Sequence, residues 1–190
     1  MNREIITIVS GLPRSGTSMM MKMLAAGGIE ALTDNMRTAD ESNPKGYYEF
    51  EKVKELAKDQ SWLPDARGRA VKIISALLKH LPPGYAYKVI FMRRNMDEIL
   101  ASQRQMLMRR GEPTDTVSDE RMAEMFGKHL KDVEAWLDKQ PDVDVLYINY
   151  NEVLKSPEEH IEQINRFFGN GLDTKSMTSI VDQALYRQKK

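Results

Sequence analysis

The chain of 190 residues is long enough for one domain with a sizeable hydrophobic core and too short for two full domains. Lysine plus arginine and aspartate plus glutamate number 28 each, so the charge balance argues against a nucleic-acid partner, and any anion site has to be local. The chain has no cysteine and only three scattered histidines, which excludes disulfides and thiolate metal sites and argues against a zinc site.

The N-terminal residues 5–24 predict a strand, a loop and a helix in succession. Ile5 to Val9 is a β-branched apolar run, Gly11 and Gly16 follow it in the loop, and a segment rich in Met and Leu comes next. No signal-peptide pattern precedes this strand, and no apolar run reaches the length of a membrane span. We therefore expect a soluble, cytoplasmic protein.

The loop that contains the two glycines is one residue short of the P-loop pattern, and Thr17 stands where the P-loop has its lysine. A glycine turn that enters a helix directs backbone N–H groups at one anion. Arg14 offers a planar donor fork, and the hydroxyls of Ser15, Thr17 and Ser18 are further donors. The alternative is an ordinary strand-to-helix turn capped by Ser15 or Thr17, and the glycines alone do not decide between the two.

After the first helix, which ends at Gly27 and Gly28, residues 30–48 are polar and rich in turn-forming residues. A long loop inside a compact domain is more often functional or mobile than structural, so we expect a mobile loop here. Helices and strands alternate in the rest of the chain. The predicted elements are a helix over 49–60, a strand over 70–74, a helix over 75–81, a strand over 87–92, helices over 96–110 and 118–139, a strand over 143–148, and helices over 157–168 and 174–185.

This alternation predicts an α/β fold with three layers, in which helices cover both faces of a mainly parallel sheet, as a single domain over residues 1–190. In such folds ligands bind beyond the carboxyl ends of the strands, at the topological switch point. Three of the four predicted strands present a cation at or after that end, namely Arg14, Lys72 and Arg94. The sequence therefore predicts an anion site at this edge of the sheet.

The strand that ends at Met92 is followed by Arg93 and Arg94. A nucleotide triphosphatase needs a magnesium-holding aspartate at a strand end and a lysine in its P-loop, and this chain departs from both requirements. An anion with phosphates at two separate places, bound without a metal, fits better. Ser102 lies eight residues after Arg94, two turns into the next helix, and is a candidate for the second phosphate. The alternative is that both arginines are solvated surface charges.

Three segments resemble the conserved blocks of the sulfotransferases that use 3'-phosphoadenosine 5'-phosphosulfate (PAPS). They are the loop LPRSGTS, the segment VIFMRRNMDEILASQ and the segment VLYINYNEVLKSP, in the family's order. The resemblance implies a P-loop NTPase-like sulfotransferase fold, PAPS as donor, adenosine 3',5'-bisphosphate (PAP) as product, and no metal. It also implies a small-molecule or peptide acceptor with a hydroxyl or amine, and it leaves a homodimer open.

The resemblance assigns binding roles block by block. In the family the second block binds the 3'-phosphate through an arginine and a serine eight residues later, which Arg94 and Ser102 match. The third block places a tyrosine near the adenine, seven residues before a proline, and Tyr150 matches it. This chain lacks the terminal Arg-Lys-Gly segment of the cytosolic members, so either Arg187 supplies a comparable contact or the C-terminal tail is flexible. The first block, which binds the 5'-phosphosulfate, corresponds here to Pro13, Arg14, Ser15, Gly16, Thr17 and Ser18.

Two cations carry catalytic roles by the same resemblance. Arg14 stands where the family has a lysine or arginine in contact with the transferring group, and Lys72 resembles a lysine that polarises the sulfuryl group. The catalytic histidine of the cytosolic members lies two residues after that lysine, where this chain has Ile74. His80 is therefore interpreted as a helix-end residue.

With no histidine in that place, a carboxylate has to remove the acceptor's proton. Glu49 is the first candidate, and Asp40 and Glu41 follow, although each could equally be a helix cap or a solvated charge. Two rival functions remain open. One is a kinase with a degenerate P-loop that uses ATP and magnesium on a small molecule, and the other is a non-catalytic module that binds adenosine bisphosphate.

Overall fold

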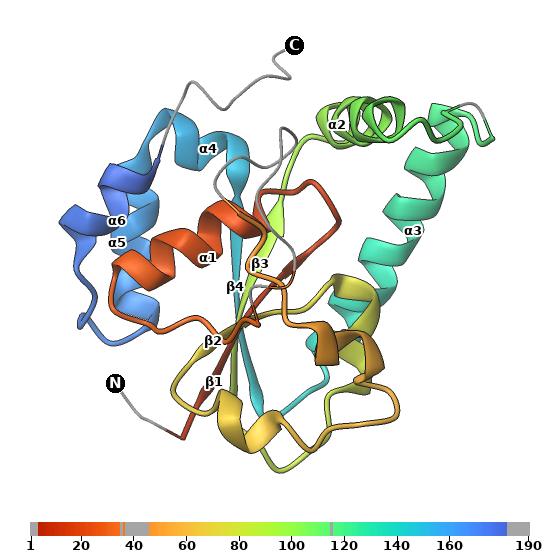
Figure 1. The fold of residues 1–190 in the computed structure, drawn as a ribbon. Helices are drawn as coiled ribbons and strands as arrows, with labels where there is room; N and C mark the ends of the chain where they lie inside the picture. Colours follow the sequence, from red (N-terminus) through yellow and green to blue (C-terminus); the bar gives the residue numbers. More distant parts are fainter. Residues whose placement is uncertain (1–3, 35, 37–45, 115, 182–190) are drawn as a thin grey trace.

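The computed structural model describes residues 4–34, 36, 46–114 and 116–181 of the chain. These residues form strands, α-helices and short 3₁₀ helices, the last written η (Figure 1). In chain order they are β1 (Ile6–Gly11), α1 (Thr17–Ala26), η1 (Glu51–Glu55), η2 (Leu63–Ala66), β2 (Ala70–Lys72), η3 (Ser75–His80), β3 (Tyr87–Arg93), α2 (Met96–Arg109), α3 (Asp119–Leu137), β4 (Val143–Asn149), α4 (Tyr150–Lys155), α5 (Pro157–Phe167) and α6 (Thr174–Ile180).

The four described strands form one parallel sheet in the order β2-β1-β3-β4. The central strand β1 pairs with both β2 and β3, so that Ile8 lies opposite Val71 on one side and Val89 on the other. The chain first leaves β1 toward β2 and then crosses back to β3, which places the topological switch point between β1 and β3. The ends of these two strands meet there, with Gly11 opposite Met92.

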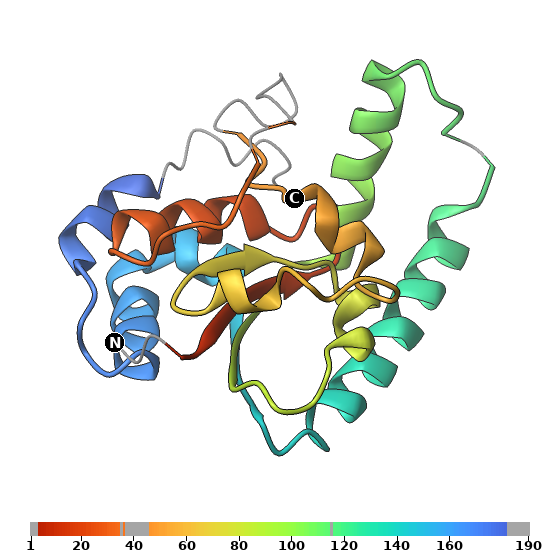
Figure 2. The same cartoon turned by 60° about the horizontal axis from the view of Figure 1, so that its bottom comes forward.

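Alternation of side chains along the strands divides the core between the two faces of the sheet. Val9 and Ile90 pack with buried residues of α1, α4, α5 and α6 on one face. Ile8, Val89 and Phe91 pack on the other face with residues of η1, η2 and η3 and with Leu137 at the end of α3. Figure 1 shows the resulting three layers, and the turned view of Figure 2 shows α2 and α3 joined at the corner away from α1.

The three-layer parallel fold and all four predicted strands are confirmed. The predicted helix over 49–60 is wrong, because the chain forms only the five-residue helix η1 there, and the predicted helix over 75–81 is the 3₁₀ helix η3. Helix α4 was not predicted at all. In the described residues no helix combines the length and the apolar character that crossing a membrane requires.

Candidate functional site

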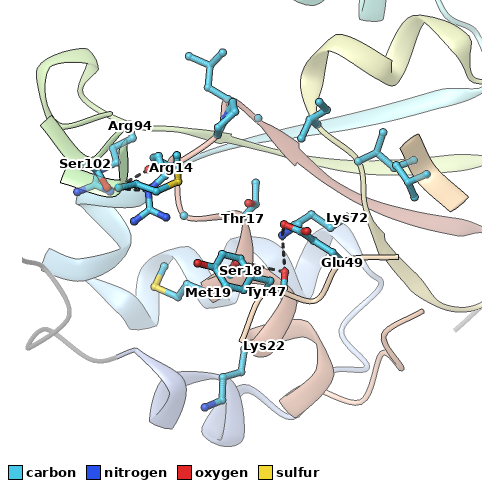
Figure 3. Close-up of a pocket in the computed structure, with 18 of the residues that line it drawn as sticks. Arg14, Thr17, Ser18, Met19, Lys22, Tyr47, Glu49, Lys72, Arg94 and Ser102 are labelled. Carbon is cyan, nitrogen blue, oxygen red and sulfur yellow. Dashed lines mark hydrogen bonds and ion pairs between the residues drawn. The ribbon is translucent and has the colours of Figure 1, made fainter. Parts of the chain in front are cut away.

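A cavity of about 890 Å³ opens at the carboxyl ends of β1, β2 and β3. Its wall comes from the loop between β1 and α1, the first turns of α1, the segment 46–50 and the inner side of α2. Figure 3 shows side chains of this wall that come from elements far apart in the sequence, with Lys22 extending away from the other labelled residues. The cavity therefore lies where the sequence predicts an anion site.

The loop that enters α1 is built around Gly16, which has a φ of 98° and forms the N-cap of the helix. A Cβ atom at Gly16 would lie 2.3 Å from the ring of Tyr150, so the backbone and the ring are in close contact. Ser15 does not cap α1; its hydroxyl donates to the carbonyl of Leu12 at 2.7 Å. No side chain of the described residues caps the helix, which contradicts the alternative of an ordinary capped turn and favours an anion at the start of α1.

Arg14, Arg94 and Ser102, here called the arginine–serine cluster, meet at one end of the cavity (Figure 3). Nε of Arg14 donates to Oγ of Ser102 at 2.9 Å, and Nη1 of Arg94 donates to the carbonyl oxygen of Arg14 at 3.0 Å. The turn into α2 thus brings Arg94 and Ser102 to one place, although eight residues separate them. The side chain of Arg14 lies with this pair, whereas the resemblance assigned it to the transferring group.

Arg93 and Arg94 face opposite sides of the sheet. Arg93 stacks on the ring of Tyr147, 4.0 Å from its centre, and pairs with Glu134 of α3 at 2.8 Å, outside the cavity. The side chain of Arg94 is 8% exposed, and its guanidinium carbon lies 4.5 Å from the centre of the Tyr150 ring. Arg94 is therefore not a solvated surface charge, whereas the side chain of Arg93 is 45% exposed, and of the two only Arg94 lines the cavity.

Lys72 and Glu49 form an ion pair at the other end of the cavity, with Nζ 3.3 Å from Oε1. The lysine also donates to the carbonyl oxygen of Tyr47. Its side chain is 9% exposed and that of Glu49 is 26% exposed, so this pair is partly shielded from water. In Figure 3, Thr17 and Ser18 lie between this pair and the arginine–serine cluster.

Hydrogen bonds tie residues 47–51 to α1 and to the residues that follow it. Ser18 donates to the carbonyl of Tyr47 at 3.4 Å, and Thr33 donates to the carbonyl of Glu49 at 2.8 Å. Oδ2 of Asp34 accepts from the N–H of Glu51 at 2.6 Å. Partial desolvation pushes the pKa of Asp34 up, but hydrogen bonds from backbone N–H groups, that of Glu51 first, outweigh it and lower this pKa below its ordinary value.

Several cavity residues were missed by sequence reasoning. Tyr47 and Lys22 carry no motif, although Lys22 lies one helical turn after Ser18 on α1. Glu98 does not line the cavity but pairs with Arg94 four residues before it, and this spacing of opposite charges could have indicated the contact. Ile74, two residues after Lys72, lines the cavity with 45% of its surface exposed.

Other predicted residues either do not line the cavity or lie outside the described residues. His80 is the last residue of η3 and is not among the described residues that line it, in agreement with its interpretation as a helix-end residue. Asp40, Glu41 and Arg187 lie outside the described residues. In the described part of the chain, no group of three or more His, Asp or Glu side chains could hold a metal ion.

A family model described as a sulfotransferase domain matches residues 5–190 of the chain. The chain is also similar to the sulfotransferase domain of the Synechococcus PCC 7002 olefin synthase, with a TM-score of 0.56 and 16% identity over 100% of this chain and 84% of that one. A search of curated protein sequences found no match.

Two further solved structures share the fold. Sulfotransferase STF1 from Mycobacterium tuberculosis H37Rv has a TM-score of 0.59 and 18% identity over 98% of this chain and 73% of that one. Mouse sulfotransferase SULT7A1, solved in complex with PAP, has a TM-score of 0.53 and 18% identity over 99% and 67%. At such identities these likenesses establish the fold alone.

Proposed function

We propose, on the premise that this chain belongs to the sulfotransferase domain family, that its sulfotransferase activity uses PAPS as the donor and releases PAP. The observation that carries this proposal is the arginine–serine cluster beside the uncapped start of α1. Together they offer two anion-binding places in one cavity, and PAPS carries anionic groups at its 5' and 3' positions.

The described residues fit such a donor. The contact between Gly16 and the ring of Tyr150 keeps the loop backbone close to the cavity, so the N–H groups at the start of α1 are suited to the 5'-phosphosulfate. The buried guanidinium of Arg94, with Ser102 close by, is suited to the 3'-phosphate. Arg14 bridges the two places, because its backbone belongs to the loop and its side chain reaches Ser102.

The ion pair of Lys72 and Glu49, at the other end of the cavity, supplies the groups proposed to act in sulfuryl transfer. When bound, the donor supplies a sulfuryl group, whose bond to the 5'-phosphate oxygen breaks as the acceptor's oxygen or nitrogen bonds to sulfur. Glu49 takes the proton of the acceptor, and Asp40 and Glu41 are the alternative bases. Lys72, which Glu49 already contacts, stabilises negative charge on the oxygens of the transferred and leaving groups.

The acceptor is proposed to be a small molecule or peptide with a hydroxyl or amine. The part of the cavity wall that Ile74, Leu77 and Met106 supply is apolar, which suits a hydrocarbon or aromatic portion of the acceptor. A transfer assay with a panel of phenols, aliphatic alcohols, amines and tyrosine peptides would identify its class.

The donor is tested by thermal shift with PAP, compared with ADP and magnesium. We expect PAP to raise the melting temperature and Arg94→Ala to abolish this rise, because a ligand stabilises the folded state only as far as it binds it. The matched control is Arg93→Ala, which removes the neighbouring arginine that faces away from the cavity and should keep the PAP shift.

Stabilisation by ADP with magnesium and not by PAP would overturn the proposal in favour of the kinase. Binding of PAP without transfer to any acceptor class would instead favour the non-catalytic module. Retention of the full PAP shift in Arg94→Ala would contradict the assignment of the 3'-phosphate to the arginine–serine cluster.

A further inference from the structure

Glu98 is a buried carboxylate on the first turn of α2, with a side chain only 5% exposed. Its Oε2 accepts from Nε of Arg94 at 2.9 Å, and its Oε1 accepts from Nδ2 of Asn151 at 2.9 Å. Both carboxylate oxygens are therefore engaged, one by the arginine of the cavity and one by α4.

The orientation of Asn151 is fixed by a further hydrogen bond. Its Oδ1 accepts from the backbone N–H of Asn95 at 3.2 Å, so Nδ2 is the atom left to face Glu98. Asn95, Glu98 and Asn151 thus join the N-cap and the first turn of α2 to the first turn of α4. This chain of contacts is here called the Glu98 network.

The Glu98 network holds the guanidinium of Arg94 on one edge. Nε of Arg94 faces Glu98, Nη1 faces the carbonyl of Arg14, and the guanidinium carbon lies over the ring of Tyr150. Among the described residues these hydrogen bonds engage Nε and Nη1 of Arg94, which leaves Nη2 to a ligand. A buried ion pair adds little net stability because both ions lose water, so a role in orientation is the better account of it.

We propose that Glu98 is a positioning residue for the 3'-phosphate, which fixes the plane of Arg94 before the nucleotide binds. This inference rests on the proposed function, because it takes the nucleotide to be PAP or PAPS. Glu98 touches neither the donor nor the acceptor and acts through Arg94 alone. Its carboxylate engages Nε of Arg94, and Nη2 is the nitrogen left to the phosphate.

The test is calorimetric binding of PAP and of adenosine 5'-monophosphate, which lacks the 3'-phosphate, to the wild type and to Glu98→Gln. The glutamine can still accept from Arg94, but its amide then meets the amide of Asn151, donor against donor. We expect PAP to bind about 10-fold more weakly, as for the loss of one charge-assisted hydrogen bond, and the monophosphate to bind unchanged. In steady state the KM for PAPS should rise more than kcat falls.

A second variant separates positioning from general damage. In Glu98→Gln with Asn151→Asp, the carboxylate moves to position 151, accepts from the new glutamine amide and keeps its contact with the N–H of Asn95. We expect this double variant to regain most of the affinity for PAP. The control is Glu134→Gln, which breaks the ion pair of Arg93 outside the cavity and should leave PAP binding unchanged.

The outcomes are distinguishable. If the wild type binds PAP no better than the monophosphate, the proposed function fails and this inference fails with it. If the wild type prefers PAP and Glu98→Gln keeps that preference, the positioning role alone is overturned. Should Glu98→Gln fail to fold, Asn151→Ala removes the second contact of Glu98, and an unchanged PAP affinity in that variant would refute the role equally.

Discussion

Arg93 and Arg94 are neighbours in the sequence with opposite surroundings at the end of β3. The first stacks on Tyr147 behind the sheet, and the second is buried against Tyr150 beside the cavity. Successive residues of an extended strand point to opposite faces, so one strand end supplies both a structural and a ligand-facing arginine. The face of the sheet on which each arginine lies therefore determines that Arg94, and not Arg93, can contact a ligand in the cavity.

At the ion pair of Lys72 and Glu49, we predict that Glu49→Gln lowers kcat by about 10²- to 10⁴-fold, the usual contribution of a positioned base. PAP affinity should change by less than about threefold, because Glu49 lies at the other end of the cavity from the arginine–serine cluster. Steady-state kinetics and calorimetry measure the two effects. Glu55→Gln, an exposed carboxylate of η1 that pairs with Lys58, serves as control. A normal kcat in Glu49→Gln would transfer the role to another carboxylate.

Gly16 and Gly28 offer a matched pair of substitutions. Their φ angles are 98° and 99°, but a Cβ at Gly16 meets the Tyr150 ring at 2.3 Å, whereas nothing lies within 4 Å of one at Gly28. Gly28→Ala should cost about 1 kcal/mol for backbone strain alone. Gly16→Ala should cost about 1–3 kcal/mol more, because the ring has to move, and should also weaken PAP binding. Urea unfolding measures both, and equal losses of stability would contradict the close contact.

Among the elements, α4 and η1 depart furthest from the sequence prediction. Helix α4 is only six residues long, and its N-cap Asn149 accepts from the N–H groups of Asn151 and Glu152. The pattern of Asn followed three residues later by Glu is a capping signal that could have revealed it. The segment that ends in η1 is instead shaped by distant contacts, since Thr33 and Asp34 bind the backbone of Glu49 and Glu51.

The hydrogen bond between Asp34 and the first residue of η1, Glu51, predicts a stability that depends on pH. The pKa of Asp34 is lowered in the folded protein, so its contribution to stability is complete above its unfolded pKa of about 3.9 and is lost as the pH falls through the folded value. The wild type should therefore melt at a higher temperature than Asp34→Asn at pH 7, and the difference should shrink as the pH falls below the unfolded pKa of about 3.9. Melting curves across this range are the measurement. A difference that persists in acid would show that the charge of Asp34 is not its cause.

At the scale of the whole molecule, the sheet separates two cores and the switch point between β1 and β3 locates the cavity. A parallel sheet that is buried on both faces is stabilised by both cores. Because its strands run in the same direction, their carboxyl ends lie at the same edge of the sheet. The fold thus supplies a rigid sheet whose carboxyl edge holds the arginine–serine cluster and Lys72. The catalytic geometry depends on that sheet remaining intact.

Strand β3, which lies inside the sheet between β1 and β4, is expected to contribute strongly to stability. Phe91 is fully buried in β3, with its ring centre 5.6 Å from that of Tyr147. Phe91→Ala should lower the free energy of unfolding by about 3–5 kcal/mol. This is a large part of the roughly 5–15 kcal/mol that stabilises a typical domain. Chemical denaturation would show it as a lower midpoint. Met125→Ala on α3, where the side chain is 51% exposed, should change stability by less than about 0.5 kcal/mol and serves as reference.

The sequence by itself determined the parallel α/β fold, the glycine turn and the cations at the strand ends. These depend on local patterns: apolar runs that form strands, glycines that permit the turn, and the fixed polarity of a parallel sheet. Only the tertiary structure decided that Arg14 meets Ser102, 88 residues away, that Glu49 meets Lys72, 23 residues away, and that Asn151 holds Glu98, 53 residues away. Such contacts form because elements far apart in the sequence come together at one edge of the sheet. No local pattern of residues specifies which distant residues will meet there.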